Sequence, residues 1–105
     1  MSHRTALCIM IAGLLGAAGS AQASQELAGK KTCLACHAVD KKVVGPAFKD
    51  VAAKYGADKD AADKLAAKVL KGSSGVWGNA VMPPMAASVS EAEAKQLAGW
   101  ILTLK

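Results

Sequence analysis

The run CLACH at residues 33–37 constrains this chain more than any other feature of its sequence. A C-x-x-C-H run is typical of covalent haem attachment, in which each thiol captures one vinyl group of the porphyrin as a thioether. On a helical turn, Cys33 and Cys36 would place both sulfurs along one edge of the haem, and His37 would lie under the iron as an axial ligand. The motif therefore predicts a cofactor, its orientation and one ligand of its metal.

Three other chemistries use closely spaced cysteines, and each fits this chain less well. Zinc needs about four nitrogen or sulfur ligands, and the only further candidates, Cys8 and His3, lie in a segment that we expect to be removed. A thioredoxin-like redox pair belongs to a βαβ pattern, but no alternating strand pattern surrounds Cys33. A disulfide between residues so close would be strained and would close almost no loop. Covalent haem attachment is therefore the favoured interpretation.

The first 23 residues have the pattern of a secretory signal peptide. Residues 1–4 carry positive charge, residues 6–19 form an uncharged apolar run, and residues 21–23 read AQA, a small-x-small cleavage pattern. The apolar run of 14 residues is shorter than the roughly 20 that a membrane-spanning helix needs. We therefore predict that residues 1–23 are cleaved, that the protein has no stable membrane insertion, and that it lies in the periplasm.

Cleavage would leave a single domain, residues 24–105. A chain of 82 residues builds a marginal hydrophobic core and usually needs an additional source of stability, such as a cross-link or a bound cofactor. A covalently held porphyrin would supply it. Its 12 lysines against 8 acidic residues leave a net charge of +4, a mild excess that favours steering toward an acidic surface over tight binding. The lysines are dispersed and no basic cluster interleaves with aromatic residues, so nucleic-acid binding is not expected.

Every regular element of the mature chain is predicted to be a helix, because alanine and lysine dominate and β-branched runs are absent. The expected helices cover residues 25–32, 47–55, a segment from Asp58 or Asp60 to Gly72, and a last segment that begins at the capping box of Ser90 and Glu93. The segment 73–89 is rich in glycine, proline and serine, and we expect no regular structure there.

Two residues of the last helix carry separate expectations. Inside a helix, Gly99 would cost about 1 kcal/mol of stability relative to alanine. The glycine either allows a close approach of the N-terminal helix or is simply tolerated. Trp100 lies beside the apolar stripe of this helix, so we expect it to flank the core.

A sixth ligand of the iron would have to come from a thioether, because the mature chain has no second histidine. Only Met82 and Met85 offer one, and both lie in the run GNAVMPPM at residues 78–85. Its prolines stiffen this loop, which could hold a sulfur over the iron at low entropy cost. Methionines that fill a core usually lie on periodic helical faces, and these two do not. Since His/Met ligation is a mode of electron-transfer haem, we expect one of them to be the ligand.

Five motifs of this chain, in this order, resemble the small bacterial class I cytochromes c of the c-551 type. They are CLACH (33–37), VGPA (44–47), KDVA (49–52), GVWG (75–78) and MPP (82–84). The likeness covers essentially all of residues 24–105. It implies an all-α cytochrome c fold, with about four helices wrapped around one covalently attached haem c. It also implies a periplasmic electron shuttle that serves respiratory chains, including nitrite reduction.

The resemblance also implies roles for single residues. The methionine before the Pro-Pro pair, Met82, would be the sixth ligand. The carbonyl of Pro46 would accept a hydrogen bond from Nδ1 of His37, and Trp77 would donate its indole N–H to a haem propionate. Lys68 stands where the family often has an arginine near a propionate, although lysine forms no planar fork.

Met85 departs from the family pattern, which commonly has asparagine after Met-Pro-Pro. Loss of the asparagine amide would change the orientation of the ligand sulfur and the reduction potential. Met85 also introduces a competing thioether, less favoured than Met82 as the sixth ligand. Val44 and Phe48 are expected to form walls of the haem pocket.

Two protein ligands would close the iron to other molecules and keep its geometry similar in both oxidation states. The leading hypothesis is therefore a monomeric one-electron carrier, not an enzyme, that cycles between Fe(II) and Fe(III). Its partners would be periplasmic or membrane-bound redox proteins, met by weak, transient docking at the haem edge. The alternatives are a haem enzyme or gas-binding sensor with an open or displaceable sixth site, and a haem subunit tethered to a larger complex.

Overall fold

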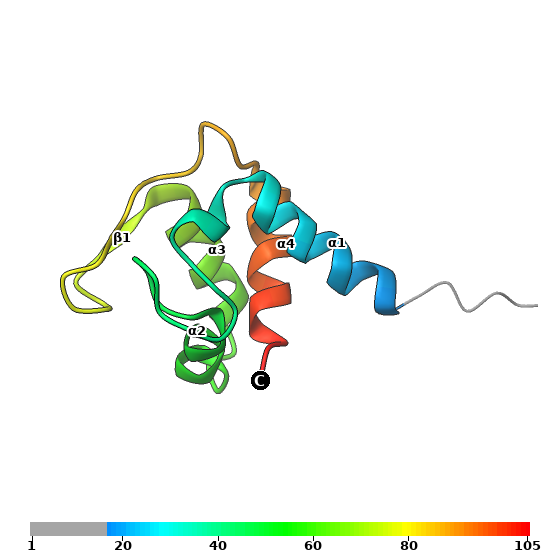
Figure 1. The fold of residues 1–105 in the computed structure, drawn as a ribbon, viewed down its shortest axis with the longest axis horizontal. Helices are drawn as coiled ribbons and strands as arrows, with labels where there is room; N and C mark the ends of the chain where they lie inside the picture. Colours follow the sequence, from blue (N-terminus) through cyan, green and yellow to red (C-terminus); the bar gives the residue numbers. More distant parts are fainter. Residues whose placement is uncertain (1–16) are drawn as a thin grey trace, which may run out of the picture.

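The computed structural model describes the backbone of residues 17–105 and the side chains from Ser24 onward. The elements along the chain are helix α1 (Ala17–Lys30), the 3-10 helix η1 (Cys33–Ala35), helices α2 (Phe48–Tyr55) and α3 (Ala61–Lys71), strands β1 (Ser73–Ser74) and β2 (Val81–Met82), and helix α4 (Glu91–Leu102). The prediction of an all-α fold with about four helices is confirmed (Figure 1). Within the described part of the chain, no helix is long and apolar enough to cross a membrane.

Helix α4 is the element on which the other helices pack. It contacts α1, α2 and α3, with α1 crossing it on one side and α2 and α3 on the other (Figure 1). Its side chains Ala94, Leu97, Ala98 and Ile101 are buried, as their helical spacing predicts. Trp100 is buried as well, so the expectation that it only flanks the core is wrong.

Helix α4 begins at the predicted capping box. The N–H of Glu93 donates to Oγ of Ser90 at 3.1 Å, and the N–H of Ser90 donates to Oε1 of Glu93 at 3.0 Å. This bond from Ser90, together with the ammonium of Lys31, holds the pKa of Glu93 below its usual value. Lys31 also donates to the carbonyl of Ser88 at 2.7 Å, so the segment after α1 is fastened to the start of α4.

Gly99 is not required for close packing of α4. A Cβ placed on this residue meets no atom within 4 Å in the described part of the structure, and the residue is exposed. The expectation of a close approach to the N-terminal helix is therefore wrong, and the glycine is simply tolerated.

Helix α1 differs from the predicted helix over residues 25–32 at both ends. It begins at Ala17, inside the expected signal peptide, because its alanine-rich first turns have high helix propensity. It ends at Lys30, and Thr32 follows with a φ of 63°. This left-handed conformation ends many helices but is unfavourable for a β-branched residue. Cleavage after Ala23 stays a prediction.

Helices α2 and α3 lie where they are expected, with a difference in capping. Helix α2 begins at Phe48, one residue later than predicted, and Gly56 follows its last turn. Helix α3 starts after Asp60, whose side chain makes no capping hydrogen bond, and the carboxylate of Asp58 accepts the N–H of Asp60 at 2.9 Å. The ammonium of Lys64, 2.6 Å from the same carboxylate, and then this N–H hold the pKa of Asp58 below its usual value.

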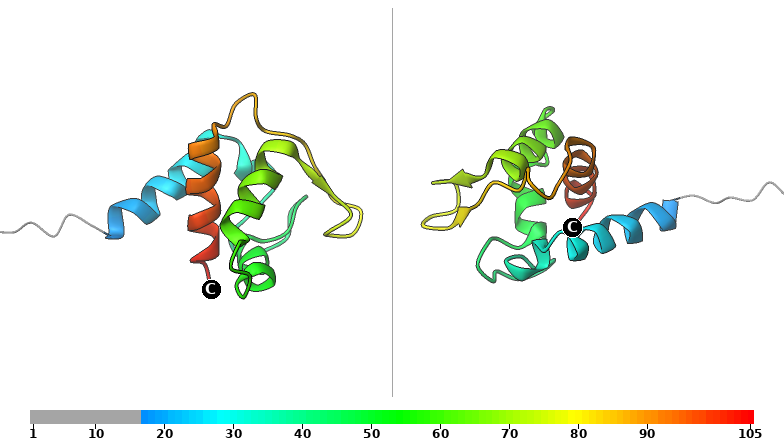
Figure 2. Two further views of the ribbon diagram at one scale, coloured as in Figure 1. Left: turned by 180° about the vertical axis from the view of Figure 1, so that it is seen from behind. Right: turned by 90° about the horizontal axis from the view of Figure 1, so that it is seen from above.

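The expectation that residues 73–89 lack regular structure is wrong in one respect. Strands β1 and β2 pair antiparallel, with Ser73 opposite Met82 and Ser74 opposite Val81. Gly78, with a φ of 67°, supplies a left-handed backbone in the connection between them. The hairpin and residues 38–47 extend from the same side of the helices (Figures 1 and 2). The pairing therefore holds Met82 next to Ser73, just beyond the C-terminal end of α3.

Candidate cofactor site

A cavity opens between η1, residues 44–48, helices α2, α3 and α4, and the hairpin. The empty space enclosed by its walls is about 960 Å³, a figure that includes open solvent at its mouth. Much of the wall is apolar and comes from Val51, Leu65, Val69, Leu97 and Ile101. Of the residues predicted from the sequence, the cavity is lined by Cys33, Cys36, His37, Val44, Pro46, Phe48, Lys68, Trp77 and Met82, and not by Met85.

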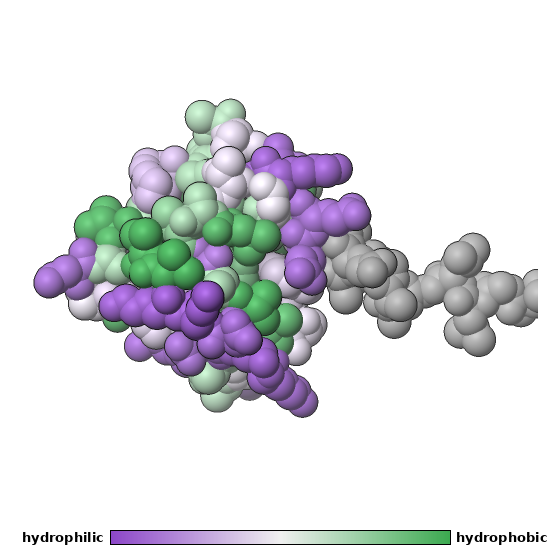
Figure 3. Space-filling model, in the orientation of Figure 1, coloured by the Kyte–Doolittle hydropathy of each residue, from purple (hydrophilic) through white to green (hydrophobic). Residues whose placement is uncertain are grey.

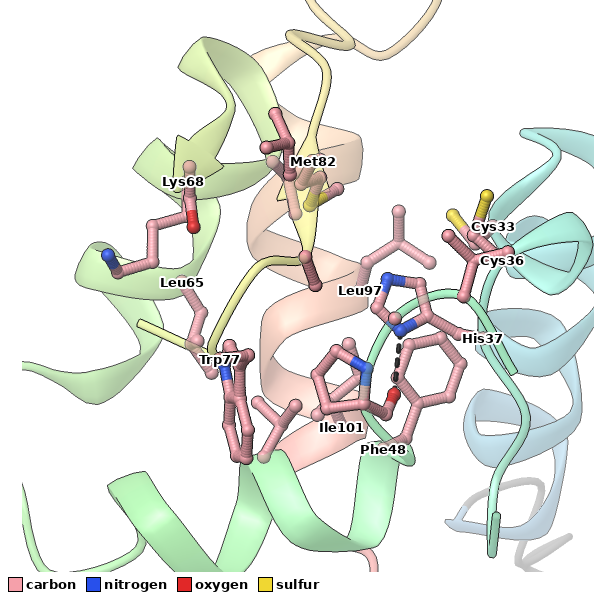
Figure 4. A pocket seen from close by; sticks show the side chains of 18 of the residues that line it. Cys33, Cys36, His37, Phe48, Leu65, Lys68, Trp77, Met82, Leu97 and Ile101 are labelled. Atoms are coloured by element: carbon pink, nitrogen blue, oxygen red, sulfur yellow. Dashed lines mark hydrogen bonds between the residues drawn. The ribbon is translucent and has the colours of Figure 1, made fainter. Parts of the chain in front are cut away.

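Cys33 and Cys36 lie together at one edge of this cavity (Figure 4). Because side chains three residues apart lie above one another on a 3-10 helix, the turn over Cys33–Ala35 brings the two thiols to the same side. Burial raises the pKa of Cys33, which favours its thiol form at neutral pH. In the part of the chain that the structure describes, no group of three or more His, Cys, Asp and Glu side chains could hold a metal ion, so nothing there supports a zinc site.

The imidazole of His37 has a fixed tautomer and orientation. Its Nδ1 lies 2.7 Å from the carbonyl oxygen of Pro46, and because a carbonyl only accepts, Nδ1 must carry the proton and donate it. The predicted hydrogen bond to Pro46 is therefore present, and it leaves the lone pair of the ring on Nε2. Figure 4 shows Nε2 directed into the cavity, toward the space that Met82 also faces.

Phe48 connects the imidazole to the hydrophobic core. Its ring stacks on that of His37, with centroids 4.9 Å apart and an angle of 20° between the planes. The ring of Phe48 also contacts that of Trp100 edge to face, with centroids 5.5 Å apart and an angle of 73° between the planes. Such pairs contribute about 0.5–1.5 kcal/mol each beyond the area that they bury. The residue predicted as a pocket wall therefore also holds the histidine against a buried side chain of α4.

Gly45 is a site residue that sequence reasoning misses. A Cβ on Gly45 would lie 2.5 Å from Cε1 and 2.9 Å from Nδ1 of His37, so no side chain fits there while the ring keeps its place. The N–H of Gly45 also donates to the carbonyl of Cys36 at 2.7 Å, which fastens the loop to the motif. The Gly-Pro pair in the sequence indicates a turn, but only the contact with the ring shows why glycine is needed.

The two candidate thioethers lie in different surroundings. Met82 is on β2 and lines the cavity, and its side chain is directed into it (Figure 4). The partly buried side chain of Met85 packs instead against the hydrophobic core. This separation supports Met82, rather than Met85, as the partner of His37.

Lys68 and Trp77 lie at the end of the cavity away from the two cysteines (Figure 4). The ammonium of Lys54 is 5.5 Å from the centroid of the Trp77 ring, a cation–π contact that steadies the indole. A cation and an indole N–H at this end suit the carboxylates of a haem whose vinyl edge meets Cys33 and Cys36. Contacts with the propionates stay a prediction for both residues.

The residues around the cavity fit a covalently attached haem. Two thiols at one edge suit the vinyl groups, and the imidazole of His37 presents Nε2 from one wall. A thioether faces the same space, and the remaining walls are apolar enough to pack on a porphyrin. Chemically, this arrangement can hold an iron between two protein ligands and keep water away from it.

Comparisons with known proteins agree with this chemistry. The chain matches the family described as Cytochrome c over residues 21–105. It is 60% identical to cytochrome c-552 of Nitrosomonas europaea over 94 residues, which cover 90% of each chain. It is 47% identical to cytochrome c-551 of Pseudomonas aeruginosa over 100 residues, which cover 94% of each. The crystal structure of wild-type Nitrosomonas europaea cytochrome c552 superposes with a TM-score of 0.75 at 60% identity, covering 77% of this chain and 99% of that one.

Replacing Gly45 by alanine tests the close fit of the imidazole. Because the new Cβ would overlap the ring of His37, Gly45→Ala should weaken the hydrogen bond to Pro46 and lower the free energy of unfolding by about 1–3 kcal/mol. The NMR shifts of the His37 ring nitrogens report the bond, and denaturant unfolding of the holoprotein reports the stability.

Gly29→Ala is the matched control. Within the described residues, a Cβ at Gly29 meets Cδ1 of Leu34 alone, at an ordinary contact distance of 3.8 Å, so this variant should leave the ring shifts unchanged. Unchanged shifts in Gly45→Ala as well would contradict the close fit.

Proposed function

The chain belongs to the cytochrome c family, as a small class I cytochrome of the c-551 type, and from this premise we propose that it is a periplasmic one-electron carrier whose iron is bound between His37 and Met82. As a member of this family, it carries one covalently attached haem c and transfers electrons rather than catalysing a reaction. The observation that carries the proposed ligation is that His37 and Met82 line the same cavity, whereas Met85 does not.

The haem supplies one-electron chemistry at its iron, and the chain's own residues set the conditions for it. The Pro46 carbonyl keeps the proton of His37 on Nδ1, which leaves Nε2 as the ligand atom and raises its basicity. Pairing of β2 with β1 holds Met82 on a short, restrained segment. Because both ligands are fixed by the fold, little rearrangement should accompany the gain or loss of an electron.

A carrier with a closed iron site is favoured over a gas-binding sensor with an open sixth position. The one sequence feature that would favour an open site is Met85, which stands where the family commonly has asparagine. Met85 packs against the core, so it leaves Met82 beside the cavity without a competing thioether there. No contact in the described part of the chain favours the open alternative.

Methionine substitutions test the ligation directly. Ferric haem bound by a methionine sulfur has a near-red absorption band. We expect this band in the wild-type protein and in Met85→Ala, and we expect its loss in Met82→Ala, because only Met82 lines the cavity. An optical spectrum of each ferric variant at neutral pH measures it. High-spin wild-type iron that binds carbon monoxide readily would contradict the proposal.

An apolar rim of four exposed side chains supports weak docking to redox partners near the haem. The rim consists of Leu34, Val43, Val44 and Val81, with exposed fractions from 43% to 68%. Val44 and Val81 also line the cavity, so this part of the rim lies at its mouth. Figure 3 shows hydrophobic surface gathered on this face, with hydrophilic side chains around it. Apolar contact with lysines nearby suits brief encounters with acidic redox proteins, and we propose a nitrite reductase among them.

Truncating the rim should slow delivery of the electron. With a purified periplasmic nitrite reductase as acceptor, we expect Val81→Ser to lower the second-order rate constant about fivefold, equivalent to about 1 kcal/mol. The measurement belongs at high ionic strength, where charge steering is screened. Ala67→Ser, on an exposed position of α3 outside the cavity, is the control. Equal rates for both variants would argue against docking at the rim.

The proposed periplasmic location rests on residues 1–23, which have the signal-peptide pattern. The solved structure of cytochrome c552 covers 77% of this chain. Residues 24–105 make up a similar share, 82 of the 105 residues. This agreement supports cleavage after Ala23.

Osmotic-shock fractionation with mass spectrometry checks the location. We expect the holoprotein in the periplasmic fraction, with Ser24 at its N-terminus. Recovery with the membranes, with residues 1–23 still attached, would favour the tethered subunit instead.

A further inference from the structure

We propose that Met85 is a positioning residue for Met82, which it steadies through the shape of its side chain rather than through its sulfur. The proposal rests on the proposed ligation of the iron by Met82. It assigns a role to the residue at which this chain departs from the family pattern.

Met85 is fastened to the fold through both of its backbone groups. Its N–H donates to the carbonyl of Val69 at 3.0 Å, near the C-terminal end of α3, where helix carbonyls lack partners within the helix. Its own carbonyl accepts the N–H of Ser88 at 3.0 Å and that of Val89 at 2.9 Å. Val89 is fully buried, so the turn that begins at Met85 is tied to the core.

The side chain of Met85 adds an apolar contact to these bonds. It is partly buried and packs against the core cluster of the helices, outside the cavity that Met82 lines. Bringing its sulfur into the cavity would break the packing and disturb the hydrogen bond to Val69. Shape and apolar character are therefore what this position contributes.

A stiff link joins Met85 to Met82. Only Pro83 and Pro84 separate them, and each proline ring fixes φ near −65°. The link also lies directly on the end of α3, because a Cβ on Gly72 would be 2.6 Å from the carbonyl oxygen of Met82 and 2.9 Å from the nitrogen of Pro84. A displacement of Met85 should therefore move Met82 as well, because the short link between them has little freedom to change its shape.

Competition by imidazole for the ferric iron measures how firmly Met82 is held. We expect Met85→Ala to bind imidazole about tenfold more tightly than the wild type, which corresponds to about 1.4 kcal/mol, because the loosened loop releases Met82 more often. Met85→Leu, which keeps the volume and removes the sulfur, should stay within about twofold of the wild type. Amide hydrogen exchange of residue 85 should be faster in the alanine variant only.

Leu104→Ala is the matched control. Leu104 also packs, partly buried, against the core cluster, but it follows the last residue of α4, Leu102, whereas residues 82–85 precede the start of α4. It should lower the free energy of unfolding without changing the affinity for imidazole. If Met85→Ala yields no holoprotein, Met85→Val, a smaller truncation, should give an increase between those of the leucine and alanine variants.

Three outcomes would overturn the proposal. An unchanged imidazole affinity in Met85→Ala would show that the packing of Met85 does not restrain Met82. Equal increases in Met85→Ala and Met85→Leu would show that the sulfur matters. A near-red band that persists in Met82→Ala would instead remove the proposed ligation, and this inference with it, so the two failures are distinguishable.

Discussion

The hydrogen bond from His37 to the carbonyl of Pro46 is the contact on which the rest of the site depends. It fixes the tautomer and therefore decides which nitrogen is free to bind a metal. The surrounding structure serves that geometry, because Gly45 leaves room for the ring and Phe48 stacks on it. The CLACH run supplies the reactive groups, and the loop that follows it holds them in place.

The fold joins the two halves of the proposed iron site through α4. One half, from the end of α1 to α2, carries the thiols and His37, and the other, from α3 through the hairpin, carries Met82. Each half packs on α4, and Lys31 bonds to Ser88 where the halves meet. A chain of this size has a marginal core of its own, so a porphyrin held between the halves would stabilise the fold as well as carry the electron.

Sequence reasoning succeeded where the signal is local. The capping box of Ser90 and Glu93 and the helix that ends at Gly72 follow from patterns within a few residues. It failed where the answer depends on contacts between distant segments. No alternating sequence pattern predicts the pairing of Ser73 with Met82. The need for glycine at position 45 arises from the ring of His37, eight residues earlier in the chain.

The sequence by itself determined the chemistry, because a C-x-x-C-H run has few uses and His37, Met82 and Met85 are the only histidine and methionines of residues 24–105. It left Met82 and Met85 as alternatives, separated only by a family resemblance. The tertiary structure distinguished their surroundings, placing one side chain in the cavity and the other against the core. The physical reason is that residues three positions apart across two prolines face directions set by strand pairing and helix packing, which no local pattern encodes.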